Sequence, residues 1–158
     1  MLKRNQVVRF MIGKESFGID IEKVHEIMTV PDITKVPDTP DFLEGIINLR
    51  GKIVSVIDLR KRLRVNGVHR DKKNRILVTE IEGRVVGLIV DEVSEVLRLD
   101  PGSIEPPPEV VSSVGADYII GVGKLKDRII LLLDIKKVLN TEEISRLGNR
   151  EEIVSAAA

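Results

Sequence analysis

The stretch FGIDIEKVHEI at 17–27 decides how this chain folds, because it returns as VGLIVDEVSEV at 86–96. A second stretch, GIINLRGKIVSVIDLRKRL at 45–63, returns as GVGKLKDRIILLLDIKKVL at 121–139. The first block repeats after 69 residues and the second after 76. Two blocks that recur in the same order indicate an internal duplication; chance similarity between aliphatic strands is the alternative. The matched positions are Gly18 with Gly87, Val24 with Val93, Glu26 with Glu95, Gly45 with Gly121, Leu49 with Leu125, Ile53 with Ile129, Asp58 with Asp134 and Leu63 with Leu139.

Short strands joined by tight polar turns run through both copies. Apolar residues make up 42% of the chain and are mostly Val, Ile and Leu, a bias that favours β-strands. Pairs of apolar stretches flank short polar segments, which is the pattern of a β-hairpin. The segments expected to form these turns are 13–16, Arg50-Gly51, Glu82-Gly83 and Lys126-Asp127.

Four or five short strands in each half predict a mainly β fold with two small closed barrels. Val54, Val56 and Ile57 in one half, and 130–133 in the other, are apolar runs that need cover on both faces. The two barrels are therefore expected to pack around a shared hydrophobic core, with short helices at their ends. The expected boundaries are one domain at 6–147, with a first barrel half at 10–65, a linker at 66–74, a second half at 75–139 and a C-terminal helix at 141–147.

An aspartate ends the last strand of each copy and is followed by a short helical pattern. Asp58 and Asp134 fit the N-cap position, where a carboxylate accepts hydrogen bonds from free backbone N–H groups. The alternative is a catalytic carboxylate pair. Their matching places in the two copies favour structural caps.

The groups that chemistry needs are scarce in this sequence. There is no Cys, His25 and His69 are the two histidines, and no zinc pattern is present. The glycines Gly121 and Gly123 do not complete a phosphate-binding motif. We therefore expect no catalytic site, no cofactor and no metal.

Charge and hydropathy limit the partners. The formal net charge is zero, with 25 basic and 25 acidic residues, whereas nucleic-acid binders usually carry a basic excess. A nucleic-acid-binding double barrel remains the alternative from a different class. No apolar run approaches the roughly 20 residues that span a bilayer, so we expect no membrane insertion and a cytoplasmic protein.

Three segments, FGIDIEKVHEIM (17–28), FLEGIINLRGKIVSVIDLRKRL (42–63) and YIIGVGKLKDRIILLLDIKKVL (118–139), resemble the CheW family of chemotaxis coupling proteins. The resemblance covers about 6–147. It implies two five-stranded barrels around a common core and a non-catalytic adaptor. The partners that it implies are the regulatory domain of the histidine kinase CheA and the cytoplasmic hairpin tip of a chemoreceptor, at the inner face of the membrane. An adaptor of the same fold in a non-motility pathway is the alternative.

The resemblance also implies receptor-binding candidates, which are Val24, Glu26, Ile27 and Arg50. Val24 and Ile27 are three residues apart, so one helical turn or a twisted edge would present both. The alternative is that these two side chains belong to the core. Arg50 lies at an expected hairpin tip, where it would bind a partner's carboxylate or carbonyl groups, or else hold its own loop.

Overall fold

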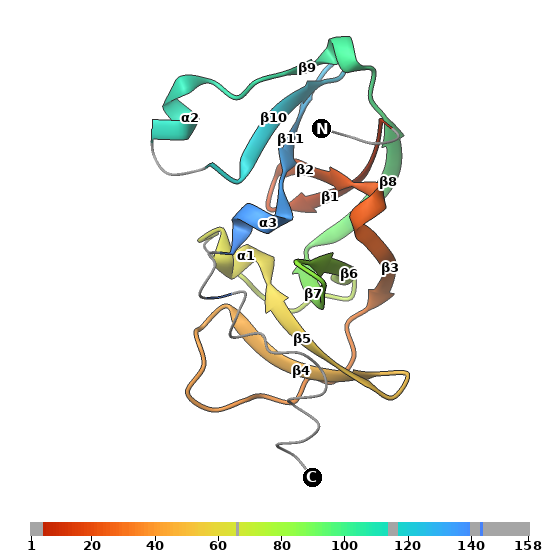
Figure 1. The fold of residues 1–158 in the computed structure, drawn as a ribbon, viewed down its shortest axis with the longest axis vertical. Helices are drawn as coiled ribbons and strands as arrows, with labels where there is room; N and C mark the ends of the chain where they lie inside the picture. The colour runs from red at the N-terminus through yellow and green to blue at the C-terminus, as the bar shows by residue number, and fades with distance from the viewer. Residues whose placement is uncertain (1–4, 66, 114–116, 140–142, 144–158) are drawn as a thin grey trace.

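The computed structural model describes residues 5–65, 67–113, 117–139 and 143 of the chain. The expected C-terminal helix at 141–147 lies outside the described residues, apart from Glu143. The fold is mainly β, with two sheets stacked one above the other in Figure 1. The six-stranded sheet has the order β8(Glu92–Arg98), β1(Gln6–Ile12), β2(Glu15–Asp20), β11(Ile129–Leu133), β10(Ile119–Lys124) and β9(Ile104–Glu105). The five-stranded sheet has the order β3(Val24–Thr29), β6(Arg75–Ile81), β7(Arg84–Val90), β5(Lys52–Asp58) and β4(Leu43–Leu49). The short helices are η1(Ile21–Lys23), α1(Leu59–Arg62), η2(Pro101–Ser103), α2(Glu109–Ser113) and α3(Ile135–Val138).

The expected hairpins are present. At the β4–β5 turn, Arg50 has φ 54° and Gly51 has φ 84°; at the β6–β7 turn, Glu82 has φ 51° and Gly83 has φ 78°. Positive φ at both central residues matches the right-handed twist of the flanking strands. The Asn48 side chain supports the first of these turns by accepting a 2.8 Å hydrogen bond from the Gly51 N–H.

Each sheet mixes strands from both copies of the duplication. In the six-stranded sheet, β1 and β2 join β8 to β11; in the five-stranded sheet, β6 and β7 join β3 to β5. The joins include two parallel pairs, β2 with β11 and β5 with β7. The sheets therefore do not follow the expected division into halves at 10–65 and 75–139, and residues 67–74 of the expected linker lead into β6 of the five-stranded sheet. Short turns fix hairpins locally, but they do not specify which distant hairpin lies alongside.

The expected closure of each sheet into a barrel is also not observed. Among the described strands, one sheet ends at β8 and β9 and the other ends at β3 and β4. Residues that precede the hairpins cover the outer edges of β10 and β4. Ile104 and Glu105 pair with β10, and Thr34 exchanges two hydrogen bonds of 3.0 and 2.9 Å with Ile46 of β4. These edge groups are thus satisfied without closure.

A central apolar cluster joins the two sheets, as the apolar runs predict. Phe10 and Phe17 from one sheet and Ile57 and Leu88 from the other belong to it. Val56, which points to the opposite face from Ile57, lies in a second buried cluster on the other face of the five-stranded sheet. The members of the central cluster include Val8, Phe10, Ile12, Phe17, Ile19, Ile57, Leu59, Leu77, Ile81, Val86, Leu88, Val90, Leu133, Ile135, Val138 and Leu139.

Candidate functional site

A β-bulge decides how β3 presents the candidate residues. Val24 lies opposite Thr79 of β6 and Glu26 lies opposite Val78, so His25 is the extra residue in the register. Because directly opposed residues share a face, the bulge puts Val24 and Ile27 on one face of the sheet and Glu26 on the other.

Val24 and Ile27 face the central cluster. Ile27 lies opposite Leu77, a member of that cluster, yet its side chain is 42% exposed. Val24 is partly buried and packs against the cluster. β3 ends its sheet, so Ile27 stands at an outer margin of the interface between the sheets.

Glu26 and Arg50 form an ion pair on the opposite face. One Arg50 nitrogen lies 2.7 Å from Glu26 Oε1 and the other lies 3.3 Å from Oε2. The hydrogen bond from Arg50, aided by its charge, lowers the pKa of Glu26, and the same contact raises the pKa of Arg50. Arg50 is 71% exposed, so its guanidinium links the β4–β5 turn to β3 while facing solvent.

The other copy supplies residues that the candidate set lacks. β8 has a bulge at the position that repeats His25, and Val96 and Val93 lie opposite Val8 and Phe10 of the central cluster. Val96 is 49% exposed and stands on an edge strand, as Ile27 does. Both strands lie along the same side of the molecule in Figure 1. The offset of 69 residues, which pairs Val93 with Val24 and Val96 with Ile27, is the sequence signal for these positions.

The second copy also repeats the acidic residue. Glu95, the counterpart of Glu26, lies 3.1 Å from Arg9 and 3.6 Å from Arg128. Arg9 is almost buried and also donates hydrogen bonds of 3.0 and 3.2 Å to Ser16. Each edge strand therefore carries an exposed aliphatic side chain on one face and a paired glutamate on the other.

Asp58 and Asp134 occupy N-cap positions. Asp58 accepts a 3.0 Å hydrogen bond from the Arg60 N–H at the start of α1, and Asp134 accepts one of 3.0 Å from the Lys136 N–H at the start of α3. Asp58 ends β5 of the five-stranded sheet and Asp134 follows β11 of the six-stranded sheet, so the two carboxylates cap separate helices.

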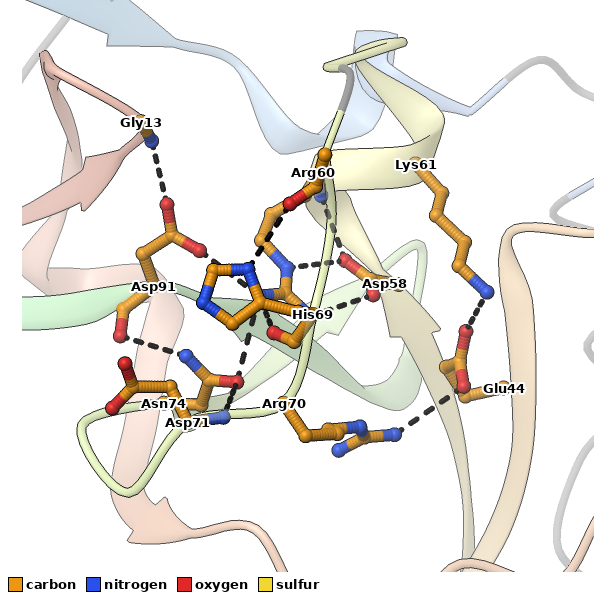
Figure 2. Close-up of polar contacts among 11 residues, drawn as sticks. Gly13, Glu44, Asp58, Arg60, Lys61, His69, Arg70, Asp71, Asn74 and Asp91 are labelled. Atoms are coloured by element: carbon orange, nitrogen blue, oxygen red, sulfur yellow. Dashed lines mark hydrogen bonds and ion pairs between the residues drawn. The ribbon is translucent and has the colours of Figure 1, made fainter.

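Arg60 is the centre of a buried polar cluster that the sequence did not reveal (Figure 2). Its Nε and one terminal nitrogen each lie 3.0 Å from an Asp58 oxygen. The other terminal nitrogen donates to Asp91 and to the His69 carbonyl, both at 2.9 Å. Burial lowers the pKa of Arg60, but hydrogen bonds and attraction from Asp58 and Asp91 outweigh it, so that the pKa is raised. A basic run such as 60–64 gives no sign of which arginine is buried.

A hollow of about 300 Å³ lies over this cluster and is lined by Gly67, His69, Asp71 and Lys73 among others. The Arg60 charge beneath it is already paired with two carboxylates. His69 lies within 3.1 Å of the Gly67 carbonyl through Nδ1. In the described part of the chain, no group of three or more His, Asp or Glu side chains is placed to hold a metal ion. Over the same residues, no helix has both the length and the apolar character to cross a bilayer.

Comparisons with known proteins agree with this picture. A family model described as a CheW-like domain matches residues 6–143. The chain is 42% identical to "Chemotaxis protein CheW" of Klebsiella aerogenes, over 89% of this chain and 84% of that protein. It is 33% identical to the protein of the same name from Treponema pallidum, over 91% of this chain and 87% of that protein. The crystal structure of the scaffolding protein TtCheW from Thermoanaerobacter tengcongensis superposes with a TM-score of 0.79 at 42% identity, covering 87% of this chain and 89% of that one. The chain therefore belongs to the CheW-like domain family.

Proposed function

We propose that this protein is a non-catalytic adaptor that couples chemoreceptors to the histidine kinase CheA in chemotaxis signalling. The observation that carries the proposal is the match of residues 6–143 to the CheW-like domain. Relatives named "Chemotaxis protein CheW" also match this chain over most of their length. Nothing in these comparisons favours nucleic-acid binding or another class of protein.

The polar chemistry of the chain supports an adaptor more than an enzyme. The buried charges Asp58 and Arg60 pair with each other, and the carboxylates Asp58 and Asp134 cap helices. Groups that are already neutralised in this way are poorly placed to act as an acid, a base or a nucleophile. The exposed features are aliphatic side chains and ion pairs at sheet edges, which are typical of protein-interaction surfaces.

We assign the receptor contact to the margin of β3, with Ile27 as its apolar anchor and Val24 as the partly buried residue behind it. An exposed aliphatic residue on a sheet edge suits one face of an amphipathic helix, such as the tip of a receptor's helical hairpin. Glu26 and Arg50 supply a charged rim. The Arg50 guanidinium is paired with Glu26 but is 71% exposed, so a partner's carboxylate or carbonyl group can reach it. Val93 and Val96 of β8 extend the same apolar margin from the other sheet.

The kinase contact is assigned to a different face, so that one adaptor holds both partners at once. Its partner is the regulatory domain of CheA, and the protein acts at the inner face of the membrane by joining receptor arrays. We assign no individual residues to this contact.

Binding measurements with purified components test the proposal. The full chain is titrated by calorimetry with the regulatory domain of the CheA of the same cell and, separately, with a soluble chemoreceptor fragment that contains the hairpin tip. We expect saturable binding to each, with micromolar or tighter dissociation constants for the kinase domain. A labelled duplex DNA at physiological salt serves as the control ligand. Absence of binding to both proteins by a folded chain would reject the adaptor role.

A further inference from the structure

The two apolar margins of the proposed receptor surface belong to different sheets. Ile27 stands on β3 of the five-stranded sheet, and Val96 stands on β8 of the six-stranded sheet. Their spacing therefore depends on how the two sheets are held together. Apolar contacts of the central cluster supply attraction, but attraction of this kind is non-directional and does not by itself fix a geometry.

A chain of short polar contacts joins the sheets at the point where the backbone crosses between them. Asp91 is the single residue between β7 and β8, and its carboxylate lies 2.9 Å from Arg60 on one side. On the other side the same carboxylate accepts a 2.6 Å hydrogen bond from the Gly13 N–H, in the β1–β2 turn. The Asp91 N–H also donates to the Met11 carbonyl at 3.1 Å. Figure 2 shows Asp91 lying between Gly13 and Arg60.

Arg60 anchors this series of polar contacts firmly on the five-stranded side. Its bidentate contact with Asp58 fixes the plane of the guanidinium, because both groups are planar forks of matching geometry. Asn74, the residue before β6, donates a 3.1 Å hydrogen bond to the Asp91 carbonyl. Arg60 and Asp58 are 2% and 1% exposed, whereas Asp91 is 34% exposed. Among these three residues, Asp91 is thus the one whose side chain can be replaced without leaving a cavity in the core.

At the other crossing between the sheets, the described residue that matches Arg60 makes a longer and more exposed contact. There the chain passes from β2 to β3 through η1, and the residue that matches Arg60 is Lys136. Lys136 contacts Glu82 across the sheets in an ion pair of 3.8 Å, in which both side chains are about half exposed. An exposed pair of this length contributes little to a fixed geometry.

We propose that Arg60 and Asp91 are positioning residues that fix the spacing between the β3 and β8 margins, and so shape the surface that receives the partner. The claim about the spacing concerns this protein alone. The claim about the partner surface rests on the proposed function, because it needs a partner that touches both margins.

Spin labels measure the spacing directly. The chain has no Cys, so a double variant Ile27→Cys and Val96→Cys carries exactly two labels at exposed sites. Dipolar spectroscopy then gives the distance distribution with Asp91 intact, with Asp91→Ala and, as the matched control, with Lys136→Ala.

We expect Asp91→Ala to shift or broaden the distribution and Lys136→Ala to leave it unchanged. Equal distributions in all three would overturn the proposal. If Asp91→Ala does not fold, Asp91→Asn, which removes the charge and keeps the shape, takes its place under the same criterion.

Binding of the receptor fragment, measured on chains without labels, tests the claim about the partner surface. We expect Asp91→Ala to weaken binding by about tenfold, which corresponds to roughly 1.4 kcal/mol, and Lys136→Ala to have no effect. A changed spacing with undiminished binding would refute the link to the partner surface. If the unaltered chain does not bind at all, the proposed function fails, while the distance measurement still decides whether Arg60 and Asp91 set the spacing.

Discussion

Asp58-Leu59-Arg60 and Asp134-Ile135-Lys136 end equivalent strands of the two copies, yet the two segments perform different tasks. Both aspartates cap a one-turn helix with a hydrogen bond of 3.0 Å. In the first copy the basic side chain turns inward and is 2% exposed; in the second it is 52% exposed. The comparison teaches that a local motif fixes the cap, whereas the surroundings decide whether the next charge becomes part of the core.

Removing each aspartate should give the largest contrast between the copies. Asp58→Ala leaves Arg60 buried without its bidentate partner, so we expect a loss of about 3 to 5 kcal/mol in the free energy of unfolding. Asp134→Ala removes only a cap, which costs about 1 kcal/mol. Urea denaturation of both variants checks the prediction. Equal losses would mean that the buried cluster adds nothing to the cap.

Gly45 of β4 and Gly121 of β10, which occupy matched positions of the two copies, differ in backbone geometry. Gly45 has φ 147°, and a Cβ there would overlap the Thr34 carbonyl, whereas a Cβ on Gly121 would meet its nearest atom, Ile104 Cγ2, at 3.3 Å. We expect Gly45→Ala to cost about 3 kcal/mol from strain and overlap together. Gly121→Ala should cost about 1 kcal/mol or less, because Ile104 has to give way only slightly to a contact at 3.3 Å. Thermal melting of the two variants measures the difference, and the reverse order would contradict the proposed role of Thr34 at the β4 edge.

Substituting the basic residue that follows each cap, Arg60 or Lys136, tests how much the bidentate contact contributes to stability. Arg60→Lys keeps a charge but loses the bidentate contact and the bridge to Asp91, so we expect a loss of about 2 kcal/mol. Lys136→Arg changes an exposed side chain and should stay within about 0.5 kcal/mol of the unaltered chain. Denaturation midpoints at constant slope provide the measurement. A tolerated Arg60→Lys would show that a point charge suffices at this site.

Reversing the charge at the first hairpin turn should separate function from stability. We expect Arg50→Glu to weaken receptor binding more than kinase binding, since it places two acidic groups beside the Ile27 margin. Lys126→Glu, in the corresponding turn of the other copy, is the matched control. Arg50→Asn tests the turn, because Asn adopts the positive φ of this position readily while lacking the charge. If Arg50→Glu reduced both kinds of binding and the melting temperature together, Arg50 would be assigned to structure.

The smallest expected effect concerns pH. The Arg50 contact lowers the folded-state pKa of Glu26 below its ordinary value of 4.5. Its stabilising contribution is therefore present above the unfolded-state pKa and is lost as the pH falls through the folded-state pKa. An NMR titration should place the Glu26 carboxyl below 4.5, and Arg50→Asn should move it back toward that value. A Glu26 pKa that does not respond to Arg50→Asn would show that the pair is not formed in solution.

The sequence by itself determined the duplication, the hairpins and the two aspartate caps, because turn chemistry, alternation and capping act over a few residues. It also determined the family, through the segments at 17–28, 42–63 and 118–139. The same duplication could have supplied Val93 and Val96 as counterparts of Val24 and Ile27.

Only the tertiary structure decided which hairpins share a sheet, and with it the burial of Arg60. The parallel pairs of β5 with β7 and of β11 with β2 join strands that are far apart in the chain, and no turn specifies them. Both copies carry the same local signals, so pairing within a copy and pairing between copies look alike in the sequence. The bulge at His25 is likewise a matter of register, and one extra residue puts Ile27 on the same face as Val24 and Glu26 on the opposite face.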